Sequence, residues 1–337
     1  MSHRAARVRT ESMVQRLSKK PLSEGFDLWD RGFTLGAMRL FIFKAETSLP
    51  FQLAPCLDAI AHLLLNMDES DDAREHFQNA SEKYDLVQQP LQAALMGIKA
   101  VDAAEGQVAA LEKINDFILK HDASRNAHAV TDLKTKTGLA RAYYIRADLA
   151  YQVSEKSSSE ALQDAEYSAS LGWDRAHLAE FLVGRIKEAA GDVQGAIEAY
   201  DKTITMNVNY IAAYEALVPL LKTMDPDRAI GTLERAIVIH PKSSLIREKV
   251  FMISEAGKDV EALAYLDHLI AHPPQEEAQS GAVLGNTTLA TLFKTKAAVL
   301  ADGGKLQEAL VAAEEASRIC PTDEEALHII SDIKGSM

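Results

Sequence analysis

Residues 177–210 read HLAEFLVGRIKEAAGDVQGAIEAYDKTITMNVNY, and this stretch decides the fold. Each half carries apolar residues at helical spacing, which predicts two helices that each bury one face. Gly191, between the halves, suits the left-handed end of the first helix, and Asp192 can cap the second. The apolar positions of the two halves are Leu182, Val183 and Ile186, then Ala196, Ile197 and Tyr200. The stretch therefore predicts a helical hairpin.

The same pattern recurs along the chain from Pro21 onward. Successive marker alanines are separated by 36, 37, 51, 35, 33, 33 and 47 residues, so most intervals lie near 34 and the two long ones equal one repeat plus an insertion. The markers, each early in a second helix, are Ala37, Ala73, Ala110, Ala161, Ala196, Ala229, Ala262 and Ala309. Four positions later, on the same helix face, stand Phe41, Phe77, Ile114, Ala165, Tyr200, Leu233, Leu266 and Ala313.

This combination of a small residue, Gly, Ala, Tyr or Phe and Pro at a period near 34 resembles the tetratricopeptide repeat (TPR). The resemblance is strongest from Ala142 to Pro321 and weakest over the first 120 residues. It implies an all-α fold, a right-handed α-solenoid of about eight TPR-like helix-turn-helix repeats with a C-terminal capping helix.

Four segments are predicted. Residues 1–20 form a basic N-terminal arm, 21–125 degenerate TPR-like hairpins, 139–322 the TPR array and 323–337 the capping helix. Thr322 to Glu325 are expected to form a capping box that opens the last helix. The polar stretch His121–Gly138 and the Pro- and Gly-containing stretch His272–Thr288 are expected to be long loops or extended helix ends, or loops that fold over the binding groove.

Charge restricts the possible partners and locations. The net charge is −13, but the first 20 residues carry six basic side chains and one acidic side chain, which leaves −18 for the body. An acidic body argues against nucleic-acid binding, which requires Lys and Arg.

No apolar run is long enough for a membrane span. The two cysteines, Cys56 and Cys320, favour a cytoplasmic protein with reduced thiols. A mitochondrial location is the alternative, with the Arg-rich arm as a transit peptide rather than a disordered arm or kinase site.

Catalytic and metal-binding motifs are lacking in the sequence. It has no Gly-rich phosphate loop, no GxSxG and no HExxH. His268 and His272 are spaced to share a metal ion, although no further ligand stands nearby except Asp267, and two polar residues at a helix end explain them equally. The chain is therefore expected to be no enzyme, and to hold no cofactor and no metal.

The TPR resemblance implies a protein partner whose extended or helical segment lies in a concave groove lined by first helices. The groove candidates are Arg141, Tyr144, Tyr151, Phe181 and Arg185. They suggest a ligand with an acidic or C-terminal carboxylate beside an apolar group, because Arg and aromatic side chains are frequent interface anchors. The Lys-Asn-Asn-Lys-Arg series that clamps chaperone tails is missing.

The function expected from the sequence is therefore a non-enzymatic interaction scaffold or adaptor. The alternative is an organellar, mitochondrial helical-repeat protein in RNA metabolism or complex assembly. The oligomeric state stays open.

Overall fold

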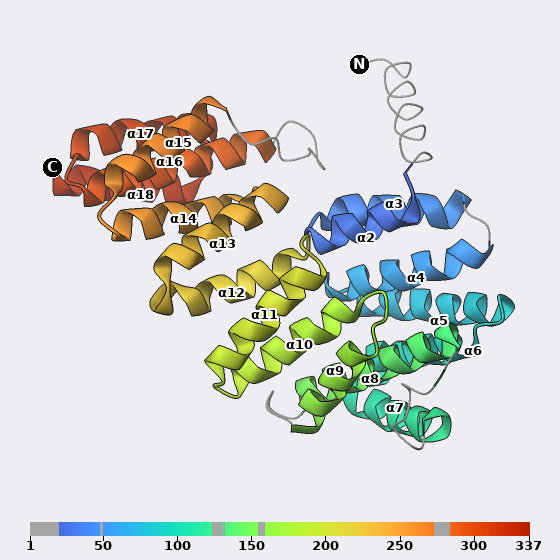
Figure 1. Ribbon diagram of the computed structural model, residues 1–337. Coiled ribbons are helices and arrows are strands. Elements are labelled where there is room, and N and C mark those ends of the chain that lie inside the picture. Colours follow the sequence, from blue (N-terminus) through green and yellow to red (C-terminus); the bar gives the residue numbers. More distant parts are fainter. Residues whose placement is uncertain (1–19, 48–49, 123–129, 131, 154–158, 273–283) are drawn as a thin grey trace, which may run out of the picture. The chain divides into compact units, whose positions relative to one another are not determined.

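A computed structural model describes the chain except for residues 1–19, 48–49, 123–129, 131, 154–158 and 273–283 (Figure 1). All regular structure within the described residues is α-helical. The chain divides into two compact units, which we call unit 1, ending at Ala213, and unit 2, beginning at Tyr214. Most of the predicted N-terminal arm lies outside the described residues, and the four predicted segments stay a prediction.

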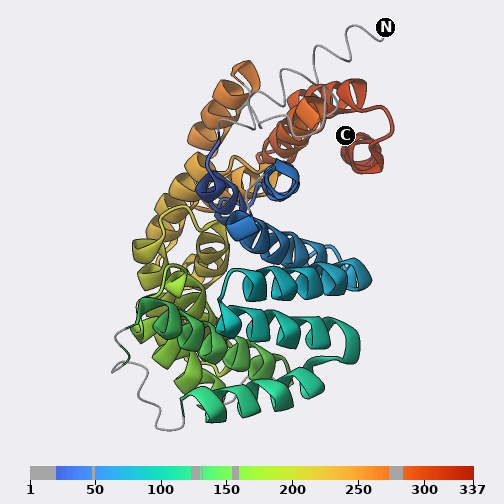
Figure 2. The same cartoon turned by 90° about the vertical axis from the view of Figure 1, so that its right-hand side faces the viewer.

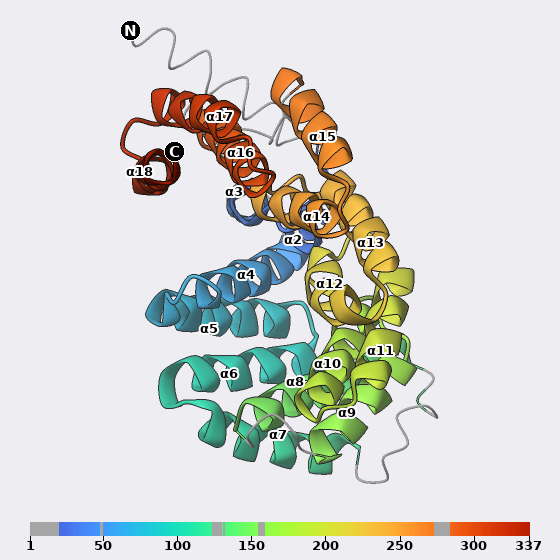
Figure 3. The ribbon, with the colours of Figure 1, turned by 90° about the vertical axis from the view of Figure 1, so that its left-hand side faces the viewer.

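Unit 1 contains ten complete described helices, which pair in sequence order into five hairpins. Their bounds are α2 Leu22–Asp30, α3 Thr34–Thr47, α4 Pro50–Leu65, α5 Ser70–Leu86, α6 Pro90–Glu105, α7 Gln107–His121, α8 Leu133–Val153, α9 Ser159–Ser170, α10 Ala176–Ala189 and α11 Val193–Met206. Figures 2 and 3 show α4, α5 and α6 stacked one upon the next.

Unit 2 continues the same arrangement with three more hairpins and a final helix in its described part. Helix α12, Ile211–Met224, begins three residues before the unit does. The others are α13 Pro226–Ile239, α14 Ser243–Glu255, α15 Asp259–Ala271, α16 Leu284–Asp302, α17 Leu306–Ile319 and α18 Glu324–Ser336. Helix α18 packs on α16 and α17 and covers the end of the last hairpin, as expected for a capping helix.

The helix crossings confirm the predicted register. Each marker alanine lies on the second helix of its hairpin and is 0% exposed, and so is the residue four positions later in every hairpin. In the fifth hairpin, α10–α11, a Cβ atom added to Gly184 would lie 2.5 Å from Cε1 of Tyr200. The two helices therefore approach so closely there that only glycine fits on α10.

The local end signals of the hairpin α10–α11 behave as predicted. Gly191 has φ 81°, which is the left-handed conformation that ends α10. Asp192 caps α11 by accepting from the amide of Gly195, and Asp225 caps α13 by accepting from the amide of Arg228. The predicted capping box is wrong by one residue. Asp323, not Thr322, caps α18, and its carboxylate accepts from the amides of Glu325 and Ala326.

The two predicted insertions are partly helical. Helix α8 has 21 residues and α16 has 19, and both begin inside the stretches expected to be loops or extended helix ends. Extra turns at the start of α8 and α16 therefore account for part of the two long intervals between marker alanines. Residues 123–129, 131 and 273–283 lie outside the described residues, so a loop over the groove stays a prediction.

Candidate binding site in unit 1

Two first helices of unit 1 present the candidate residues in stripes. On α8, Arg141, Tyr144, Asp148 and Tyr151 follow each other at intervals of three and four residues, so they share one face. On α10, His177, Phe181 and Arg185 do the same at intervals of four. Helix α10 contacts both α8 and α9.

Arg141 lies at one end of the α8 stripe and already has a carboxylate partner. Its guanidinium donates to Oδ2 of Asp58 on α4 at 2.7 Å and to Oε1 of Gln92 on α6 at 2.7 Å. Burial by itself raises the pKa of Asp58, but the charge of Arg141 and a hydrogen bond from His62 outweigh it and hold this pKa below its usual range. This ion pair joins α8 to α4, so Arg141 serves the packing of unit 1.

Tyr144 and Phe181 take part in aromatic contacts within unit 1. The ring of Tyr144 lies 5.9 Å from that of Trp173, in the connection before α10. The ring of Phe181 lies 5.5 Å from that of Tyr200 and 5.2 Å from that of Tyr210. Both candidate side chains are half-buried, so each keeps part of its surface accessible.

Arg185 is the exposed member of the α10 stripe. Its guanidinium carbon lies 4.9 Å from the centre of the Tyr151 ring, within the range of a cation–π contact. Among the residues that the structure describes, no carboxylate pairs with Arg185 and no hydrogen bond engages it. Stacking on a buried tyrosine therefore positions a positive charge whose hydrogen-bonding capacity is unused.

Three phenol groups around Arg185 are also donors without acceptors, and among them lies one carboxylate, Asp148, which accepts from the amide of Gln152 at 3.0 Å. We call Tyr144, Asp148, Tyr151, Arg185 and Tyr210 the Arg185 cluster. Burial raises the pKa of Tyr144 and the Asp148 carboxylate raises it further, while the charges of Arg175 and Arg185 lower it. Burial also raises the pKa of Tyr210, and the charges of the same two arginines lower it. In the described part of the chain, none of the three phenol groups of the cluster has a hydrogen-bond partner.

The connection between α9 and α10 adds two buried donors beside this cluster. Trp173 is 8% exposed, and its indole N–H has no acceptor among the described residues. The Nε of Arg175 is likewise buried without an acceptor. An indole nitrogen and a guanidinium can only donate, so this side of unit 1 carries more donors than its own acceptors satisfy. A carboxylate with an apolar neighbour fits such surroundings.

Sequence reasoning found four of the residues on this side of unit 1 and missed four others. Tyr144, Tyr151, Phe181 and Arg185 were selected because they lie on first helices. Asp148 shares their helix face, so the spacing of α8 could have included it. Trp173, Arg175 and Tyr210 lie in connections, where no periodicity indicates which way a side chain points. Whether the five predicted residues bind a peptide stays a prediction.

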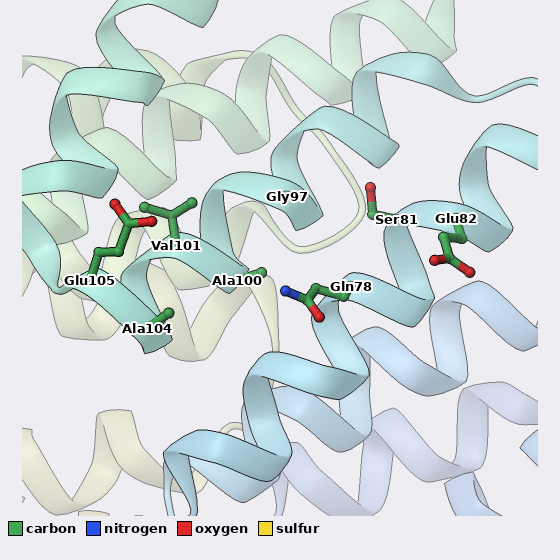
Figure 4. A pocket seen from close by; sticks show the side chains of 8 residues that line it. All are labelled: Gln78, Ser81, Glu82, Gly97, Ala100, Val101, Ala104 and Glu105. Carbon is green, nitrogen blue, oxygen red and sulfur yellow. The ribbon is translucent and has the colours of Figure 1, made fainter.

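Two shallow pockets lie elsewhere in the described structure. One, of about 390 Å³, lies between α5 and α6 and is lined by Gln78, Ser81, Glu82, Gly97, Ala100, Val101, Ala104 and Glu105 (Figure 4). The other, of about 400 Å³, lies between α12 and α14 in unit 2 and is lined by residues that include Val218, Pro219 and Leu245. The candidates of the first helices in unit 1 line neither pocket.

The rings of His268 and His272 lie 5.0 Å apart, but no three His, Cys, Asp or Glu side chains gather as metal ligands in the described part of the chain. None of the described helices combines the length and the apolar character needed to cross a bilayer.

Comparisons with known proteins concern the fold. No family model and no curated protein matches the chain. The crystal structure of MamA matches with 20% identity and a TM-score of 0.37, over 55% of this chain and 96% of that chain. YrrB, described as a TPR protein with an unusual peptide-binding site, matches with 19% identity and a TM-score of 0.40, over 65% and 97%. A chain of the APC/C hetero-tetramer Cut9–Hcn1 matches with 13% identity and a TM-score of 0.49, over 98% of this chain and 60% of that chain.

The repeat itself decides the class of protein, because every hairpin buries its marker alanine and the residue four positions later at one crossing. The chain has a TPR-like helical-repeat fold. Arrays of stacked helical repeats create extended surfaces that such proteins use for binding. The Arg185 cluster, built on two first helices of this TPR-like array, is therefore its candidate binding surface.

Proposed function

We propose that this TPR-like protein is a non-enzymatic interaction scaffold that binds a segment of a partner protein at the Arg185 cluster. The observation that supports the proposal is Arg185 itself. Its charge is stacked on Tyr151, exposed, and unpaired among the described residues. A scaffold that holds an anchor in place before binding loses less conformational entropy when its partner arrives.

The partner segment carries an acidic side chain or a C-terminal carboxylate beside an apolar group. Arg185 pairs with the carboxylate, and the phenol groups of Tyr144 and Tyr210 can donate to the same oxygens. Phe181 supplies aromatic surface for the apolar neighbour. A true anchor of this kind contributes about 2 kcal/mol or more, which corresponds to about 30-fold in Kd.

A peptide library displayed with free C-termini tests the proposal. We expect selection on the full chain to enrich peptides that carry a carboxylate next to an apolar residue, and Arg185→Ala to weaken the enriched peptides about 30-fold. Arg185→Lys keeps the charge but loses the planar stacking, so its effect is expected to be intermediate. Arg74→Ala, on the exposed face of α5, is the matched control.

The double change Phe181→Ala and Arg185→Ala is the stronger version of this test. Circular dichroism comes first, because Phe181 also packs on Tyr200 and Tyr210. A folded double variant that binds the enriched peptides as well as the wild type does would remove the groove proposal at these two hairpins.

Cytoplasmic residence is part of the proposal, with a mitochondrial protein of RNA metabolism or complex assembly as the alternative. The alternative depends on the basic arm, since transit peptides are rich in Arg and poor in acids. Fusion of residues 1–20 to a fluorescent protein separates the two. A mitochondrial signal supports the alternative, and a diffuse cytosolic signal removes it.

A further inference from the structure

Helix α2 carries an acidic-aromatic segment, Phe26-Asp27-Leu28-Trp29-Asp30, that contacts the far end of unit 1. The guanidinium of Arg175 donates to Oδ1 of Asp30 at 2.6 Å, over a sequence separation of 145 residues. The amide of Asn207 donates to Oδ2 of the same carboxylate at 2.8 Å. The amide of Asn209 donates to Oδ1 of Asp27 at 2.7 Å. We call Arg175, Asn207 and Asn209 the α2-binding face.

The aromatic residues of the segment complete this contact. The guanidinium carbon of Arg175 lies 5.1 Å from the ring centre of Phe26 and 5.2 Å from that of Trp29. Arg175 therefore pairs with a carboxylate and lies over two rings at once. A planar guanidinium favours such a combination, because its edge donates to oxygen while its face stacks on aromatic carbon.

This arrangement has the chemistry proposed for an external ligand at the Arg185 cluster. An acid beside an apolar side chain meets an arginine, and the charges of Arg175 and Arg185 both act on Tyr144 and Tyr210. The two arginines thus belong to neighbouring parts of one donor-rich surface. Asp27 and Asp30 do not satisfy every donor of this surface, because the Nε of Arg175 and the indole N–H of Trp173 still have no acceptor in the described structure.

The apolar contacts of α2 lie within hairpins 1 and 2, and Phe26 and Trp29 take part in them as well as in the contact with Arg175. Leu28 belongs to a buried cluster with Phe33, Leu40 and Phe41 of the same hairpin and with Ile60 of α4. The contacts of the segment with the α2-binding face are hydrogen bonds and cation–π contacts. A polar contact of this kind can exchange with another segment of the same chemistry, because both partners regain hydrogen bonds when it separates.

We infer that the α2-binding face is a receptor for acidic-aromatic segments and that α2 occupies it as an internal ligand. A partner protein with an acid flanked by aromatic residues displaces α2 and fills the donors that α2 leaves unsatisfied. This inference rests on the proposed function, since it names the partner chemistry and the regulation of the same donor-rich surface. Because α2 competes from within the chain, only molecules in which α2 has left the face can bind the partner. The apparent affinity for the partner is therefore the intrinsic affinity multiplied by the fraction of such molecules.

The probe is a fluorescein-labelled peptide of residues 20–31, KPLSEGFDLWDR, added to the full chain. Wild-type protein binds it weakly because its own α2 is in place. In the double change Asp27→Asn and Asp30→Asn, the internal ligand is weakened, and we expect the peptide to bind about tenfold more tightly. Adding Arg175→Gln to this double variant abolishes the gain.

Two controls separate recognition from unspecific opening. Glu24→Gln alters an acid on the same helix that pairs with Lys20, so it leaves peptide affinity at the wild-type value. A peptide in which Asp27 and Asp30 are both replaced by Asn does not bind the opened variant. Hydrogen exchange of the α2 amides rises in the double variant and not in Glu24→Gln, and it stays high when the native peptide is added, because the peptide then occupies the face that α2 has left.

The inference is overturned if a folded double variant binds the peptide no better than the wild type does, or if Arg175→Gln leaves the gain intact. If the double variant does not fold, Asp27→Asn alone replaces it, because this side chain is 41% exposed and its loss leaves Asp30 in place. Failure here is distinguishable from failure of the proposed function. The latter is measured with library peptides and Arg185→Ala, whereas this test uses the α2 peptide and Arg175→Gln.

Discussion

Hairpin 1 (α2–α3) and hairpin 5 (α10–α11) have little sequence in common but the same crossing. In hairpin 5, Gly184 precedes Ala196 by 12 positions and Tyr200 by 16. In hairpin 1, Gly25 precedes Ala37 and Phe41 by the same intervals. A Cβ atom added to Gly25 would lie 2.6 Å from Cε1 of Phe41. The corresponding distance from a Cβ atom added to Gly184 to Cε1 of Tyr200 is 2.5 Å. A degenerate repeat has therefore kept the contact that sets the distance between its helices.

Other hairpins fill the same crossing with different side chains. Val250 and Leu266 share a buried cluster in hairpin 7, α14–α15, and Ala297 and Ala313 share one in hairpin 8, α16–α17. Each pair again stands 16 positions apart. Close packing constrains the volume at a crossing more than the identity of each residue. The interval is therefore the constant feature of this chain, and the glycine-aromatic pair is one solution.

The largest expected effect tests whether the two crossings are equally important. Phe41 and Tyr200 are both fully buried. Phe41→Ala and Tyr200→Ala should each lower the free energy of unfolding by about 3–5 kcal/mol, because each leaves a cavity opposite a glycine. Urea denaturation monitored by circular dichroism measures both. A much smaller cost for Phe41→Ala would mean that hairpin 1 unfolds separately from the rest of unit 1.

Overpacking the same crossings should have the next largest effect. Ala37 and Ala196 are 0% exposed and leave no room for a longer side chain. Ala37→Leu and Ala196→Leu should each cost about 1–3 kcal/mol. Thermal denaturation checks both, with an exposed position of the same helix, Gln194→Leu, as the control for α11. An unchanged melting temperature for either variant would show that the register of that hairpin is wrong.

The sequence predicts the hairpins because their signals are local. Spacing identifies the buried faces, Gly191 and Asp192 mark a turn, and a period near 34 aligns the weak repeats with the strong ones. Gly25 could also have been found, by counting 12 positions back from Ala37 as from Ala196 to Gly184. The capping error at Thr322 arose because two neighbouring residues, Thr322 and Asp323, are both good caps.

The contacts that organise the candidate site are of another kind. Arg141 and Asp58 are 83 positions apart, and Arg175 and Asp30 are 145 apart. A repeat period predicts only how each hairpin meets its neighbours, so it contains no information about such pairs. In both cases the pair joins hairpins that are not neighbours in the chain, hairpin 4 with hairpin 2 and the connection before hairpin 5 with hairpin 1.

A smaller effect should follow from making hairpin 5 more like hairpin 1. The phenol of Tyr200 donates to a carboxylate oxygen of Glu188 at 2.6 Å, a bond for which Phe41 has no counterpart. Tyr200→Phe should therefore cost about 1 kcal/mol, because the ring still fills the crossing while one hydrogen bond is lost. Glu188→Gln in the Tyr200→Phe background is the control, and it should add little. A cost as large as that of Tyr200→Ala would show that the hydrogen bond, rather than the ring, holds the crossing.

The smallest effect concerns the turns of the same two hairpins. Gly32 ends α2 with φ 83° and Gly191 ends α10 with φ 81°, and side chains disfavour this left-handed conformation. A Cβ atom at Gly191 would meet nothing within 4 Å, so its substitution tests backbone strain without steric overlap. Gly32→Ala and Gly191→Ala should each cost about 1 kcal/mol. Gly231→Ala, inside α13 and also in open space, should instead stabilise by about 0.5–1 kcal/mol, because glycine weakens a helix interior. If all three changes stabilised the chain, positive φ would not be what retains glycine at the two turns.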